Sequence, residues 1–200
     1  MSELLTRMKI ATMALAALLL AGCGRQAGPP STVGGTVKDS SGRPAAGALV
    51  RVSSAQPGRV VLVVNTASHC GYTSQYGPLE AVWRANRPRG LTVLGVPSKD
   101  FQQELPTDAL VKRFCKRNFG VTFPMLRISR VTGAKAIPLF KGLAAPSWSS
   151  QPEWNFNKYL VDRSGRVAMY FPSSEEPDSP AVTKAIDALL GERRARSAQR

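Results

Sequence analysis

One cysteine lies between a predicted buried strand and a predicted helix. Residues 60–65 form a continuous apolar run, and Cys70 follows shortly after it. Unpaired backbone N–H groups and the helix dipole at such a turn favour an anionic sulfur, and the thiolate is the nucleophilic form of cysteine. The sequence therefore predicts a reactive thiol at Cys70, with an inert buried cysteine as the alternative.

The chain holds two more cysteines, Cys23 and Cys115. Cys115 falls in a predicted helix, where it is either a thiol that resolves an oxidised Cys70 or a buried structural thiol. Thr73 stands where a Cys-x-x-Cys dithiol carries its second sulfur, which argues against a thiol-disulfide oxidoreductase but leaves it as an alternative function. One histidine, His69, cannot form a metal site, so we expect no metal and no organic cofactor.

Predicted strands alternate with predicted helices along the part of the chain that must position these residues. In chain order the predicted elements are a hairpin or edge strands at 36–52, a strand at 60–65, a helix at 76–85, a strand at 91–96, a helix at 108–118, a hairpin at 156–161 and 167–171, and a helix at 180–190. Continuous apolar runs predict strands covered on both faces. Thr107 predicts the cap of the second helix. This order predicts an α/β protein with a thioredoxin-like fold, a mixed central sheet with helices on both faces.

Four separated segments resemble the glutathione peroxidase family, in the family's order. They are residues 64–73, 94–101, 114–124 and 154–162, and the resemblance spans about residues 60–190. Several motifs in the correct order are more specific than any one of them. The resemblance implies a peroxidase of the thioredoxin-like fold.

The resemblance also implies a site of four residues, which are Cys70 as the peroxidatic residue, Gln103, Trp154 and Asn155. Gln103 is preferred to Gln102 because Glu104 follows it, although the loop before it is about one residue shorter than the family pattern. Neutral indole, carboxamide and backbone N–H donors would stabilise both the thiolate and the oxygen that leaves when an O–O bond breaks.

The amino-terminal segment predicts export. Arg7 and Lys9 precede an apolar stretch at 10–20 that is short for a membrane span, and Leu-Ala-Gly-Cys then ends at Cys23. This ending resembles a bacterial lipoprotein cleavage box, which implies lipidation of Cys23 and anchoring in the bacterial envelope, facing the periplasm. The expected organisation is a signal peptide at 1–22, a flexible tether at 23–35, one domain at 36–191 and a basic tail at 192–200.

The net charge of +14 bears on the partners. Export and the scatter of the basic residues argue against nucleic acid and favour anionic lipid headgroups.

We predict a lipid-anchored thiol peroxidase of the envelope oxidative stress response, which reduces hydrogen peroxide or organic hydroperoxides through a sulfenic acid at Cys70.

The predicted partners are the hydroperoxide, a thiol reductant (a thioredoxin-like protein or glutathione) and the membrane through Cys23. By resemblance, the short segment at 143–153 implies a monomer. A non-catalytic envelope lipoprotein that reuses the fold is the remaining alternative.

Overall fold

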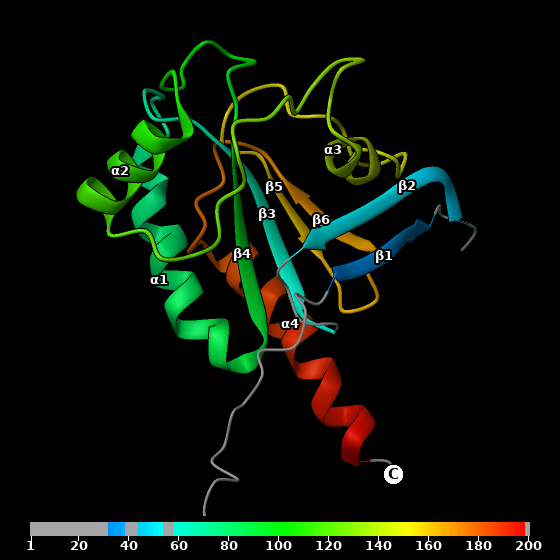
Figure 1. Cartoon of the computed structure of the whole chain (residues 1–200). Coiled ribbons are helices and arrows are strands. Elements are labelled where there is room, and N and C mark those ends of the chain that lie inside the picture. The colour runs from blue at the N-terminus through cyan, green and yellow to red at the C-terminus, as the bar shows by residue number, and fades with distance from the viewer. Residues whose placement is uncertain (1–31, 39–43, 54–57, 199–200) are drawn as a thin grey trace, which may run out of the picture.

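Four strands form the central sheet of the chain. The computed structural model describes residues 32–38, 44–53 and 58–198. The sheet has the order β4-β3-β5-β6 (Figure 1), with β3 at Val60–Thr66, β4 at Leu91–Pro97, β5 at Lys158–Val161 and β6 at Val167–Phe171. β3 pairs parallel with β4 and antiparallel with β5, and β5 pairs antiparallel with β6. The sheet is therefore mixed, as the sequence predicted.

Helices cover both faces of this sheet. The helices are α1 at Tyr76–Asn86, α2 at Asp108–Phe119, α3 at Pro138–Leu143 and α4 at Pro180–Ala198. Leu62 of β3 belongs to a core that includes residues of α1, α2 and α4, whereas its neighbour Val63 belongs to a second core that includes Phe140 of α3. Successive side chains of a strand point to opposite faces, so burial of all seven residues of β3 explains its uninterrupted apolar run.

Two helix boundaries follow local chemistry that is visible in the sequence. The Thr107 hydroxyl accepts a hydrogen bond from the Leu110 N–H at 3.3 Å and caps α2. After α1 and the short 3-10 helix η2 (Arg87–Arg89), Gly90 takes φ +107°, a left-handed conformation that glycine adopts without steric cost. The chain then enters β4.

The structure differs from the sequence prediction in the bounds of some elements and in one additional helix. β5 begins at Lys158 rather than at 156, because Phe156 has φ +64° and interrupts the extended run. The six-residue helix α3 had no counterpart among the predicted elements. α4 continues to Ala198, beyond the predicted helix end at 190, and so includes most of the basic tail at 192–200.

The amino-terminal hairpin forms a separate two-stranded sheet. β1 (Thr32–Lys38) pairs antiparallel with β2 (Pro44–Ser53). β1 begins inside the segment predicted as a tether at 23–35, while the predicted signal peptide and Cys23 lie outside the described residues. Across the residues that the structure describes, no helix combines the length and apolarity needed to cross a membrane.

Candidate active site around Cys70

Cys70 lies in the turn between β3 and the helical segment that opens with the 3-10 helix η1 (Thr73–Gln75) and continues as α1. Its own N–H donates to the Thr73 hydroxyl at 2.9 Å, and that hydroxyl donates to the Ala67 carbonyl at 3.1 Å. The backbone N–H of Tyr72 donates to the Cys70 Sγ at 3.4 Å, and the residue is 8% exposed. The turn therefore supplies a backbone donor to the sulfur.

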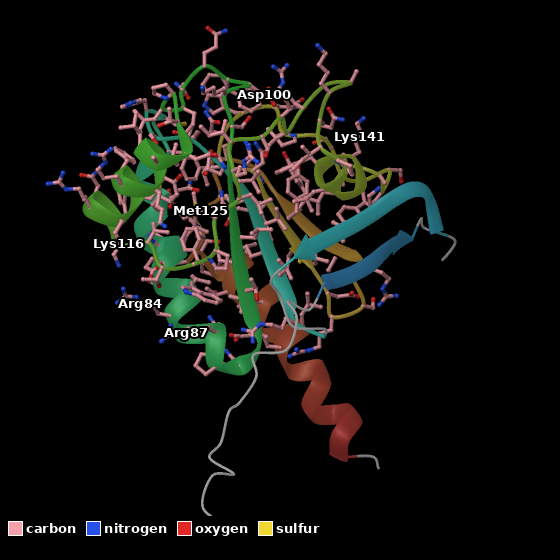
Figure 2. The ribbon with its side chains drawn as sticks, in the orientation of Figure 1. Arg84, Arg87, Asp100, Lys116, Met125 and Lys141 are labelled. Atoms are coloured by element: carbon pink, nitrogen blue, oxygen red, sulfur yellow. The ribbon has the colours of Figure 1, made fainter. Side chains whose placement is uncertain are left out.

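The loop at 100–105 lies against the Cys70 turn. The N–H of His69 donates to the Gln103 carbonyl at 2.9 Å. Asp100 secures the start of this loop by accepting hydrogen bonds from the N–H groups of Val131 (2.6 Å) and Thr132 (3.1 Å), and Figure 2 labels Asp100 at this end of the sheet. Gln103 is thereby held beside His69, the residue that precedes Cys70.

Of the two glutamines, Gln103 is the one that faces a second site residue. Its Oε1 accepts a hydrogen bond from Asn155 Nδ2 at 2.9 Å. Gln102 is exposed and has φ +58°, and its N–H donates to the Lys99 carbonyl at 3.0 Å. This tight left-handed turn is how the short loop still brings the next glutamine inward.

Buried asparagines hold the Trp154-Asn155 segment in place. The Asn65 carboxamide in β3 and the Asn157 carboxamide both donate to the Trp154 carbonyl, at 2.8 Å and 2.6 Å. Asn155 is fully buried. The Trp154 ring is 42% exposed, and its centroid lies 5.5 Å from that of Phe101 in the loop at 100–105.

Three loops thus converge at one end of the sheet, and they bring together three of the four predicted site residues. Cys70, Gln103 and Asn155 are connected through His69 and the Gln103 side chain. Within the described part of the chain, no hydrogen bond joins the Cys70 sulfur to Gln103, Trp154 or Asn155 themselves. Their catalytic roles therefore stay predictions.

Glu104 is a half-buried carboxylate that ties the loop at 100–105 to the Cys70 turn. Its Oε1 accepts from the Ser68 N–H at 3.1 Å, the Ser68 hydroxyl at 2.5 Å and the Leu105 N–H at 2.7 Å. Burial raises the pKa of the Glu104 carboxyl, and the hydrogen bonds from Ser68 and Leu105 act in the opposite direction. In the sequence, Glu104 served only to identify Gln103, and its anchoring role emerges from the structure.

Lys158 is a fully buried charged residue close to the Trp154-Asn155 segment. Its Nζ donates to the carbonyls of Phe156 (2.7 Å), Pro172 (3.1 Å) and Ser173 (3.3 Å). Burial lowers the pKa of Lys158 to about 8, while Glu176 and Glu175 act to raise it. Sequence reasoning gave Lys158 no role, although a lysine at the start of an apolar strand is the kind of signal that identifies such an anchor.

Cys115 lies on the inner side of α2 and is 2% exposed. Burial raises the pKa of its thiol to about 11, and a hydrogen bond with Tyr76 lowers it in part. Both described cysteines, Cys70 and Cys115, are free thiols. Over the same described residues, no group of three or more His, Cys, Asp and Glu side chains could hold a metal ion.

Known proteins resemble this chain in sequence. A profile of the family described as glutathione peroxidase matches residues 38–144. The glutathione peroxidase-like peroxiredoxin GPX5 of Chlamydomonas reinhardtii is 44% identical over 137 residues, which cover 66% of this chain and 85% of the relative. The hydroperoxy fatty acid reductase gpx1 of Synechocystis sp. is 43% identical over 143 residues, which cover 66% and 83%.

Solved structures resemble it in fold. The apo crystal structure of Trgpx superposes with a TM-score of 0.53 at 32% identity, over 78% of this chain and 92% of that one. A protein named as the thiol:disulfide interchange protein DsbE of Chlorobium tepidum superposes with a TM-score of 0.50 at 20% identity, over 80% and 100%. The second likeness concerns the fold alone. The predicted thioredoxin-like fold is confirmed.

Proposed function

Because the chain belongs to the glutathione peroxidase family and is a peroxidase of that type, we propose that Cys70 is the residue that reduces the hydroperoxide. The observation that carries this proposal is the local geometry of the Cys70 turn. A backbone N–H reaches the sulfur, and the hydrogen-bonded carboxamides of Gln103 and Asn155 are tied to the neighbouring residue.

The proposed reaction begins with the Cys70 thiolate attacking one oxygen of the hydroperoxide. A sulfur–oxygen bond forms while the O–O bond breaks, so the sulfur is oxidised by two electrons to a sulfenic acid and the peroxide is reduced by the same two electrons. The leaving alkoxide or hydroxide takes a proton and departs as alcohol or water. Neutral N–H donors stabilise the negative charge that develops on this oxygen, which is the role proposed for Gln103, Trp154 and Asn155.

A second thiol then condenses with the sulfenic acid, forming a disulfide and releasing water. Reduction of that disulfide by a thioredoxin-like protein or by glutathione restores Cys70. Cys115 is the proposed intramolecular partner. Both thiols are buried in the same core, on the side of the sheet that α1, α2 and α4 cover, and the structure has them as separate free thiols.

The proposed substrates are hydrogen peroxide and organic hydroperoxides. The name of the Synechocystis relative, a hydroperoxy fatty acid reductase, supports including fatty acid hydroperoxides. The proposed location is the bacterial envelope, with the chain exported, lipid-anchored through Cys23 and active as a monomer in the oxidative stress response. The amino-terminal sequence supports the anchor.

Trapping the sulfenic acid tests the proposed role of Cys70. Purified protein is treated with one equivalent of peroxide, labelled with dimedone and digested, and each cysteine peptide is quantified by mass spectrometry. We expect the label on Cys70, and no peroxide consumption by a Cys70→Ser variant. Label confined to Cys115, or undiminished peroxide consumption by Cys70→Ser, would refute the proposal.

A separate fractionation tests the anchor. The full chain, expressed with its amino-terminal segment in a bacterium, is expected in the membrane fraction. A Cys23→Ser variant should leave that fraction, and equal membrane association of the two proteins would contradict lipidation.

A further inference from the structure

A pocket of about 600 Å³ lies between α2 and the segment at 121–127, away from the four predicted site residues. The segment at 121–127 runs along the outer edge of the sheet, where the Gly95 N–H donates to the Pro124 carbonyl at 3.0 Å and the Leu126 N–H donates to the Gly95 carbonyl at 2.8 Å. In Figure 2, Met125 is labelled between α2 and β4. The pocket is thus bounded by a helix on one side and an added edge segment on the other.

The interior of this pocket is apolar. Its apolar lining consists of Val111, Val121, Phe123, Met125 and Leu126, with Cys115 among them. Ligand pockets in proteins have volumes of roughly 300–1,000 Å³ and are lined mainly by hydrophobic side chains with few polar groups. The volume and the lining fit a single flexible hydrocarbon chain.

Cationic side chains form the rim of the pocket. Lys112 and Lys116 come from α2, and Arg127 comes from the opposite wall. The pocket's one carboxylate, Asp108, is already occupied, because it accepts the Ile128 N–H at 2.7 Å and lies 3.6 Å from Arg127. No ion pair within the described residues involves Lys112 or Lys116, so these two exposed ammonium groups are free to bind an anion at the pocket mouth.

We propose that this pocket binds a fatty carboxylate, with its hydrocarbon chain over the apolar lining and its carboxylate at Lys112 and Lys116. The charge of the rim selects an anionic head, and the apolar lining selects an aliphatic tail. None of Cys70, Gln103, Trp154 and Asn155 lines the pocket. A fatty carboxylate in this pocket is therefore not bound as the substrate of the Cys70 site.

The position of Cys115 gives the pocket a consequence for the thiol chemistry. Cys115 lines the pocket from α2. A hydrocarbon chain bound there contacts both α2 and the segment at 121–127. A ligand that binds only while α2 is packed as in this structure shifts the conformational equilibrium toward that packed state. Occupancy should therefore slow any opening of α2 that exposes Cys115. An effect of the ligand on peroxidase turnover would rest on the proposed function. Binding of the fatty carboxylate and the accessibility of Cys115 do not depend on that function.

Binding is measured by calorimetry on the full chain carrying Cys70→Ser, with dodecanoate kept below its micelle concentration. We expect saturable binding of dodecanoate at one site, and at least tenfold weaker binding of uncharged dodecanol and cationic dodecyltrimethylammonium. The double variant Lys112→Glu, Lys116→Glu should also bind dodecanoate at least tenfold more weakly. Lys184→Glu changes an exposed lysine of α4 and serves as the matched control, with unchanged affinity.

The same Cys70→Ser protein reports on Cys115. Alkylation by iodoacetamide, followed at the Cys115 peptide, should slow at least threefold when dodecanoate saturates the site and should keep its rate at the same concentration of dodecanol. Absence of saturable binding, equal affinity for dodecanoate and dodecanol, or an equal loss in Lys184→Glu and the double variant would overturn the proposal. Dodecanoate binding that does not slow the alkylation of Cys115 would mean that dodecanoate binds outside this pocket, and it would overturn the proposal as well. Since Cys70 is replaced throughout, failure of the peroxidase proposal would leave these results unchanged.

Discussion

Replacing Lys158 by methionine removes a buried ammonium group while keeping most of the side chain's length. In the native protein this group donates to the Phe156, Pro172 and Ser173 carbonyls beneath the Trp154-Asn155 segment. Methionine cannot donate, so three carbonyls lose this partner. We expect Lys158→Met to fold with lower stability, by an amount that depends on pH.

The size of the effect follows from two opposing contributions. Hydrogen bonds to a charged group contribute roughly 1.5–3 kcal/mol each, so three of them at the low end contribute roughly 4–5 kcal/mol. Burial shifts the pKa of Lys158 from 10.5 to about 8, which costs about 3 kcal/mol at 1.36 kcal/mol per unit. At pH 7 we therefore expect the variant to be about 1 kcal/mol less stable than the native protein.

The sign of the pH dependence follows from the lowered pKa. Between about pH 8 and 10.5 the folded protein has released the Lys158 proton while the unfolded chain still holds it. The unfolded state then binds more protons, so the stability of the native protein rises with pH through this window. Lys158→Met lacks this contribution, and the stability gap between the two proteins should widen by about 2–3 kcal/mol from pH 7 to pH 10.

Urea unfolding of both proteins at pH 7, 8, 9 and 10, followed by tryptophan fluorescence, measures this gap. Other titrating groups contribute equally to both proteins and cancel in the difference. Lys184→Met, at an exposed position of α4, is the matched control and should show no widening. A gap that stays constant or narrows as the pH rises would refute the account of Lys158.

Three further outcomes follow from the site and its surroundings. Gln103→Ala and Asn155→Ala should each lower the stopped-flow rate constant for thiol oxidation by peroxide about 100-fold, with the double variant little worse than either, since the two side chains are hydrogen-bonded; multiplicative losses would contradict a joint role. The rate at which iodoacetamide alkylates Cys115 in the native protein should keep rising with pH up to about pH 11, and a rate that levels off near pH 8.5 would contradict the raised pKa of the Cys115 thiol. Gly95→Ala would make its new Cβ overlap the Met125 Sδ and should lower the unfolding free energy measured in urea by about 1–3 kcal/mol, with Met125→Ala recovering part of the loss; absence of recovery would show that the clash is not the cause.

Much of the fold could be predicted from the sequence because local physics determines it. The continuous apolar run that became β3 and the helical spacing of Leu79 and Val82 in α1 reflect burial. Thr107 before α2 and Gly90 before β4 reflect capping and left-handed backbone geometry. α3 escaped prediction because a helix of six residues has little periodicity, and its stability comes from packing on the sheet.

Part of the candidate site was likewise determined by the local sequence, and the rest depended on the tertiary structure. The sequence by itself determined the Cys70 turn, because the strand, the turn and the helix that shape it lie within a few residues of each other. It also supplied the residue types of the remaining site. The sequence preferred Gln103 to Gln102 because Glu104 follows it, but only the tertiary structure decided that Gln103 meets Asn155, through a left-handed turn and a partner 52 residues away. It likewise decided that the half-buried Glu104 and the buried Lys158 are anchors, because only the folded chain brings their hydrogen-bond partners to them and residue spacing does not reveal those partners.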